Sequence, residues 1–132
     1  MSLIVCDTHS LLWFLNDDAR LSQKASAAMD EAEATGTIYV PTIAIIEMRY
    51  LTEKNRISLA AYRTALQTLR NPVTALEIVS LDLEIADALD RIPRAAVPDM
   101  PDRIIAAAAR YLGLPLVTAD RQIHASGINT IW

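Results

Sequence analysis

The chain has 132 residues, of which 52% are hydrophobic and 21% are charged. This length suits a single domain over residues 1–132, and the apolar content is too high for a disordered chain. The formal net charge of −4 argues against nucleic-acid binding through overall positive charge. Ten of the twelve basic residues are nevertheless arginine, the side chain suited to paired contacts with phosphate oxygens.

The chain has a single cysteine, Cys6, which excludes an internal disulfide and a cysteine-rich metal site. Its place in the apolar run 3–6 favours a buried side chain over a reactive thiol. The amino terminus lacks a basic segment followed by a long apolar one, and no apolar stretch is long enough to span a bilayer. We therefore expect a soluble, cytoplasmic protein with no membrane contact.

Short apolar runs alternate with helical patterns along the chain, as in α/β domains with a mainly parallel sheet. Strands are predicted at residues 3–6, 37–40, 77–81, 116–118 and 130–132. Helices are predicted at 10–15, 22–34, 42–54, 58–70, 82–92 and 102–112, with Thr42, Ser58 and Asp82 as N-caps and Gly36 and Gly113 as C-terminal caps. Three nearby prolines predict a loop over 94–101. The expected fold is an α/β domain with four or five strands flanked by helices.

Two aspartates follow predicted strands. Asp7 comes directly after the first strand, and Asp120 follows the fourth. Parallel sheets place their functional sites at the carboxyl ends of strands, so these two residues are candidates for one site. Either can equally be a helix N-cap. Thr118 offers a hydroxyl close to Asp120, although a β-branched residue is also ordinary in a strand.

Glu47 lies in an apolar stretch of a predicted helix. Its neighbours three and four positions away are Ile43, Ala44, Tyr50 and Leu51, none of which can form a salt bridge with it. Burying an unpaired carboxylate is costly, so Glu47 faces either solvent or a site where a cation compensates its charge. The apolar surroundings favour the second arrangement.

Asp99 and Asp102 lie in the proline-rich segment before the last long helix. Asp99 is a possible N-cap, with Pro101 in the first turn and Asp102 stabilised by the helix dipole. Capping and catalysis remain equal alternatives for each residue. Acids gathered at one sheet edge would repel one another and raise some of their pKa values. A hard divalent cation, Mg²⁺ or Mn²⁺, relieves such repulsion in an all-oxygen site.

The chain resembles PIN-domain proteins, and within them the VapC toxins of VapBC toxin–antitoxin pairs. The landmarks appear in family order, within a resemblance that spans 3–132, at 5–13, Glu47, 99–103 and 116–120. The resemblance implies a three-layer PIN-like fold. It implies a catalytic and metal-binding site made of Asp7, Glu47, Asp102 and Asp120, with Thr118 and Asp99 as further members.

The activity implied by the resemblance is Mg²⁺- or Mn²⁺-dependent hydrolysis of RNA, by an endoribonuclease that a cognate VapB-like antitoxin inhibits and that forms a homodimer. Arg103 and Arg121 directly follow two of the acids, and either contact RNA phosphate or pair with the acids. Residues 13–15 are either core or part of a surface that receives the antitoxin or a second subunit. The loop 97–101 departs from the usual family pattern, which leaves its substrate contacts open.

Two other functions are alternatives to a PIN-type ribonuclease. A phosphatase of the haloacid-dehalogenase type requires a second aspartate two residues after the first, where this chain has His9. A catalytically inactive PIN-like module for protein interaction is the stronger alternative, and the intact set of four acids argues against it. Neither His9 nor His124 is required as a general base; His9 is either a substrate contact or part of the helix start.

Overall fold

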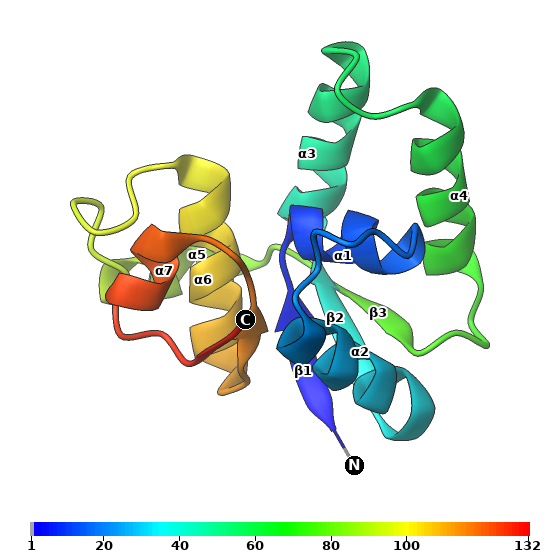
Figure 1. The fold of residues 1–132 in the computed structure, drawn as a ribbon. Coiled ribbons are helices and arrows are strands. Elements are labelled where there is room, and N and C mark those ends of the chain that lie inside the picture. The colour runs from blue at the N-terminus through cyan, green and yellow to red at the C-terminus, as the bar shows by residue number, and fades with distance from the viewer. Residues whose placement is uncertain (1) are drawn as a thin grey trace.

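The computed structural model describes residues 2–132. Its five strands form one all-parallel sheet in the order β3-β2-β1-β4-β5 (Figure 1). The strands are β1 (Leu3–Cys6), β2 (Thr37–Pro41), β3 (Leu76–Val79), β4 (Leu116–Val117) and β5 (Thr130–Ile131). The predicted α/β class and the parallel sheet are confirmed.

Helices cover both faces of this sheet. They are α1 (Thr8–Leu15), α2 (Gln23–Thr35), α3 (Thr42–Glu53), α4 (Leu59–Arg70), α5 (Leu83–Asp87), the 3-10 helix η1 (Ala88–Arg91), α6 (Met100–Leu112) and α7 (Arg121–Ala125). Helices α5, α6 and α7 gather on one side, and α1, α2 and α4 lie on the other (Figure 1). Helices α3 and α4 form a hairpin that projects beyond the sheet (Figure 1).

Several local predictions need correction. Helix α1 begins at Thr8, and β3 ends at Val79, each two residues earlier than predicted. Pro41, not Thr42, is the N-cap of α3, and the Thr42 hydroxyl instead donates to the carbonyl oxygen of Val79 at 3.0 Å. Helix α6 begins at Met100, two residues earlier than predicted, because Asp99 caps it and a proline is tolerated in a first turn. The helix predicted over 82–92 is divided into α5 and η1.

The central strands are buried on both faces, as parallel strands between helical layers must be. Val5, Cys6, Ile38 and Val40 have no exposed surface. Burial also raises the pKa of the Cys6 thiol, which agrees with the expected structural role for this residue. Within residues 2–132, no helix combines the length and apolar content needed to cross a membrane.

Candidate functional site

Asp7 and Asp120 lie at the same edge of the sheet, as predicted. Asp7 links β1 to α1, and Asp120 follows β4 and precedes α7. Strands β1 and β4 are parallel neighbours, with Cys6 opposite Val117. Both aspartates therefore project from adjacent strand ends, and both line one cleft of about 460 Å³.

Both aspartates also cap helices, so the structural alternative is confirmed for each. One oxygen of Asp7, Oδ1, accepts a hydrogen bond from the backbone N–H of Ser10 at 2.9 Å. Oδ1 of Asp120 accepts from the backbone N–H groups of Gln122 and Ile123, at 2.8 and 3.1 Å. In both residues the capping hydrogen bonds engage Oδ1 and not Oδ2. Capping thus fixes each carboxylate while leaving its second oxygen for another ligand.

Glu47 is half-buried and lines the same cleft from the second turn of α3. Its Oε1 accepts a hydrogen bond from the hydroxyl of Thr8 at 2.6 Å, and Thr8 is itself buried. This contact joins the start of α1 to α3 and holds the Glu47 carboxylate toward the acids of the sheet edge. Glu47 therefore faces the cleft instead of open solvent, as its apolar surroundings favoured, while its role there stays a prediction.

The two acids at the start of α6 complete the cleft. Asp99 is exposed and its Oδ1 accepts from the backbone N–H of Asp102 at 3.1 Å, which is the expected N-cap contact. Asp102 is half-buried in the first turn. Glu47, Asp99 and Asp102 each offer an oxygen, and these three oxygens lie within 4.8 Å of one another. Asp99, whose role the sequence left open, therefore lies within the cluster of converging oxygens.

The crowding of carboxylates alters their acidity. The pKa of Asp102 is raised from 3.8 to about 8, mainly by burial, then by the charge of Asp99 and by a hydrogen bond with Asp120 and its charge. Burial also raises the pKa of Glu47, an effect that the Thr8 hydroxyl opposes. Such a set of oxygens is short of positive charge, which a divalent cation would supply.

The donors of the cleft fit a hard cation. Besides Thr8, His9, Trp13 and Ala119, its lining consists of the five carboxylates of Asp7, Glu47, Asp99, Asp102 and Asp120. Carboxylate oxygens with room for water are the ligands of Mg²⁺ and Mn²⁺, whereas zinc sites usually include cysteine or histidine. The cleft contains no cysteine and one histidine, His9, beside five carboxylates, so its donors are mainly oxygen and suit an ion such as Mg²⁺ or Mn²⁺.

Buried hydroxyls form hydrogen bonds with the segments that carry the acids. Thr118 has no exposed surface, and its Oγ1 accepts from the backbone N–H of Asp120 at 3.0 Å. Ser10 donates to the carbonyl oxygen of Val117 at 3.1 Å and so ties α1 to β4. Sequence reasoning missed Thr8 and Ser10, although both directly flank a strand-end aspartate in a predicted helix start.

The arginines that follow the acids have different surroundings. Arg103 donates to the carbonyl oxygens of Ile92 and Leu89, at 2.7 and 2.9 Å, and so secures the end of η1 against α6. It does not line the cleft, and its guanidinium pairs with no acid among residues 2–132. Arg121 is exposed beside Asp120. His124, given no role by the sequence, contacts the carbonyl oxygen of Thr118 through Nε2 at 2.8 Å.

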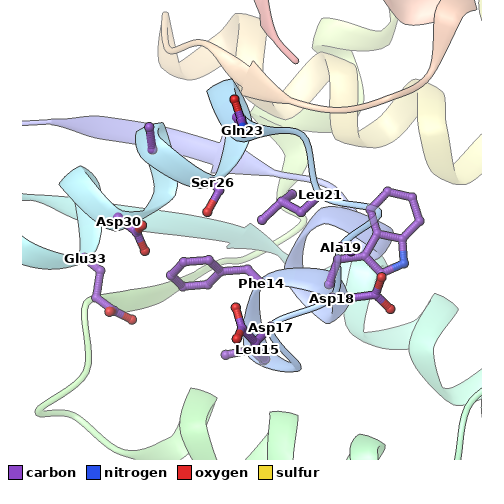
Figure 2. Close-up of a pocket in the computed structure, with 12 residues that line it drawn as sticks. Phe14, Leu15, Asp17, Asp18, Ala19, Leu21, Gln23, Ser26, Asp30 and Glu33 are labelled. Atoms are coloured by element: carbon purple, nitrogen blue, oxygen red, sulfur yellow. The ribbon is translucent and has the colours of Figure 1, made fainter.

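A second acidic hollow, of about 810 Å³, lies between α1 and α2 (Figure 2). Asp17, Asp18, Asp30 and Glu33 line it around the ring of Phe14. Asp18 is paired with Arg20 at 2.7 Å, and that pairing lowers the Asp18 pKa to about 2. Within residues 2–132, these acids do not form a group of three converging oxygens. This larger hollow therefore lacks the arrangement that makes the cleft a metal-site candidate.

The sequence and the fold both match known proteins. Residues 4–127 match the family model of the PIN domain. Ribonuclease VapC22 of Mycobacterium tuberculosis is 30% identical over 125 residues, which cover 95% of this chain and 92% of that protein. The match therefore extends through nearly the full length of both chains.

Solved structures with the same fold have lower sequence identity. One belongs to VapBC2 from Rickettsia felis bound to a promoter DNA fragment, with a TM-score of 0.72, 14% identity, and coverage of 97% of this chain and 96% of that chain. Another is VapC20 of Mycobacterium tuberculosis, a toxin that cleaves the sarcin–ricin loop, with a TM-score of 0.69, 15% identity and 95% coverage of each chain. The family model and the full-length relative show that the chain belongs to the PIN-domain family, in its VapC branch.

Proposed function

We propose that this protein is a ribonuclease that hydrolyses RNA phosphodiester bonds with Mg²⁺ or Mn²⁺, and that it acts as the toxin of a VapBC-type pair. The observation that carries the proposal is the convergence of five carboxylates in one cleft, with oxygens of Glu47, Asp99 and Asp102 within 4.8 Å. The 30% identity to a VapC ribonuclease over nearly the full length supports the same conclusion.

The five acids fall into two groups, those held by helix-capping hydrogen bonds and those that are half-buried. Asp7, Asp99 and Asp120 are fixed by helix-capping hydrogen bonds, so they present oxygens from a rigid backbone. Glu47 and Asp102 are half-buried with raised pKa values, so they gain most from a cation. A divalent ion held by these oxygens would supply the Lewis acidity that phosphodiester hydrolysis needs. Thr8 and Thr118 position Glu47 and Asp120.

The proposed partners follow from charge and exposed apolar surface. An arginine of a VapB-like antitoxin fits the acidic cleft by charge complementarity and would exclude the metal and the RNA together. Ile46, Tyr50, Leu83 and Met100 are large exposed side chains on α3, α5 and α6, and α6 packs against both α3 and α5. Apolar surface of this kind suits the interface of a homodimer.

The function is tested by cleavage of cellular RNA with the purified full-length chain. Cleavage should require Mg²⁺ or Mn²⁺, stop in EDTA, and disappear in Asp7→Asn while circular dichroism remains unchanged. Cleavage that survives both EDTA and Asp7→Asn would disprove the metal-dependent mechanism. Light scattering tests the homodimer, and co-purification with the product of an adjacent small gene tests the antitoxin.

A further inference from the structure

Three hollows of the molecular surface meet at Trp13. They are the acidic cleft, the α1–α2 hollow, and a third hollow of about 530 Å³ between α1 and the turn of the α3–α4 hairpin. We call the third one the hairpin groove; its lining includes His9, Trp13, Arg20, Arg56 and Ile57. Because His9 and Trp13 line both the cleft and the hairpin groove, the two hollows adjoin at these side chains.

The hairpin groove leads on to a basic surface. A further hollow of about 720 Å³ lies at the tip of the α3–α4 hairpin and shares Arg56, Ile57 and Ser58 with the groove. Arg49 and Arg63 also line it, with Glu53 as its single acid. Three adjoining hollows therefore lead from the acidic cleft to three arginines.

The charge of the two exits decides which one a polyanion would take. The α1–α2 hollow has four acids and no lysine or arginine in its lining, so it repels phosphate. The hairpin groove has one acid in its lining, Asp18, which pairs with Arg20. At the hairpin tip, Arg49 pairs loosely with Glu53 at 3.5 Å. Neither Arg56 nor Arg63 pairs with a carboxylate anywhere in residues 2–132, and both are exposed. These two guanidinium groups remain available for phosphate oxygens.

Aromatic rings line the junction between the cleft and the groove. The exposed ring of His9 lies 5.6 Å from the Trp13 ring, and Trp13 lies 5.8 Å from Trp132. The guanidinium of Arg20 lies 5.2 Å from the Trp13 ring centre and is held there by Asp18. Single-stranded nucleic acid binds to such combinations, because bases stack on rings while arginines follow the phosphates.

We propose that single-stranded RNA held in the acidic cleft continues along the hairpin groove, with a base stacked on His9 and Trp13 and with phosphates bound by Arg56 and Arg63. This binding track rests on the proposed ribonuclease function and extends it to residues outside the acids. It explains how a chain of net charge −4 binds a polyanion: the arginines lie where the strand leaves the cleft.

The first experiment compares a long and a short substrate. Cleavage is measured on a single-stranded RNA of about 16 nucleotides and on one of about four nucleotides with the same cut site. Arg56→Ala and Arg63→Ala should each raise KM for the long RNA roughly three- to tenfold, with kcat and the short RNA unaffected. Arg70→Ala, an exposed arginine at the other end of α4, is the matched control and should change nothing.

The second experiment measures binding without cleavage, by fluorescence anisotropy of the long RNA on the full-length Asp102→Asn chain. Each track arginine replaced by alanine should lower the slope of log affinity against log salt by about 0.7. His9→Ala should weaken binding roughly tenfold, and His9→Phe should restore it because the ring is kept.

The outcomes separate this inference from the ribonuclease proposal. If Arg56→Ala and Arg63→Ala keep metal-dependent cleavage with the KM and salt slope of the wild type, the binding track is overturned but the ribonuclease function is not. The groove would then fit a protein segment instead of RNA. Absence of cleavage by the wild type would overturn the function, while the anisotropy series would still decide whether the groove binds RNA. A loss in His9→Ala that His9→Phe does not restore would overturn the stacking role.

Discussion

Trp13 borders two acidic hollows that have similar numbers of carboxylates but differ in how those groups are buried and supported. In the cleft, Glu47 and Asp102 are half-buried and their pKa values are raised. In the α1–α2 hollow, Asp17, Asp30 and Glu33 are exposed and Asp18 is neutralised by Arg20. Water and Arg20 therefore compensate the acids of the α1–α2 hollow, whereas the acids of the cleft lack a counter-charge.

The comparison shows that the number of acids does not define a metal site. Repulsion between carboxylates is weak where water screens it and strong where protein replaces water. The carboxylates of the cleft cannot move apart to relieve their repulsion, because capping hydrogen bonds and Thr8 hold them in place. Functional sites commonly combine such strain with rigid support. Substitutions in each hollow in turn test whether the cleft binds metal and the α1–α2 hollow does not.

The largest expected effect is the loss of cleavage in Asp102→Asn. Removing this central oxygen should lower kcat/KM at least about 100-fold, because even groups that only orient metal ligands cost 10- to 100-fold when removed. Asp30→Asn in the α1–α2 hollow is the control and should retain wild-type activity. Equal losses in both variants would erase the distinction between the hollows.

Metal binding should stabilise the folded protein through the cleft alone. At a metal concentration about 100 times Kd, the free energy of unfolding should rise by about 2.7 kcal/mol. Differential scanning fluorimetry with Mn²⁺ and Mg²⁺ should show this rise in the wild type and in Asp30→Asn, but a much smaller one in Asp102→Asn. A Tm increase that persists in Asp102→Asn would place the ion elsewhere.

Thr8→Val should lower kcat/KM about tenfold, since the Glu47 carboxylate loses the hydroxyl that positions it. Valine keeps the shape of the buried threonine, so stability should fall by only about 1 kcal/mol. Thr42→Val is the matched control: its hydroxyl also joins two elements, at 3.0 Å from the Val79 carbonyl oxygen, but lies outside the cleft. If the two variants lose activity equally, Thr8 acts through general stability.

The smallest effect concerns pH and the metal-free protein. The pKa of Asp102 is higher in the folded chain than its ordinary 3.8, so the folded state binds this proton more tightly. Stability from this group is greatest below its unfolded pKa and declines as the pH rises toward about 8. In EDTA, Asp102→Asn should therefore be more stable than the wild type at high pH, by about 1 kcal/mol after allowance for solvent screening.

Asp18, the partner of Arg20, should affect the pH dependence of stability in the opposite direction. The pKa of Asp18 is lowered to about 2 by hydrogen bonds from Arg20, so its contribution is present above its unfolded pKa and is lost as the pH falls toward 2. Chemical denaturation in EDTA across the range from acid to neutral pH would separate the two behaviours. A stability difference between wild type and Asp102→Asn that did not grow with pH would contradict the assigned environment of Asp102.

The sequence determined much of the fold, because its signals are local. The apolar run 3–6 predicted β1, and alternating strands and helices predicted the parallel sheet. Gly113 predicted the carboxyl end of α6, and Asp99 was a possible N-cap, through capping chemistry that depends on neighbouring residues alone. Placement of Asp7 and Asp120 at one sheet edge also followed, because parallel strands share the direction of their carboxyl ends.

Only the tertiary structure decided which long-range contacts join these elements. Nothing near Thr8 in the chain identifies Glu47, 39 residues away, as the partner of its hydroxyl. Arg103 adjoins Asp102 in sequence, yet its guanidinium turns to the carbonyl oxygens of η1, because a helix directs successive side chains to different faces. The joining of the cleft to the hairpin groove likewise depends on the packing of α1 beside the α3–α4 turn, and no local pattern encodes that packing.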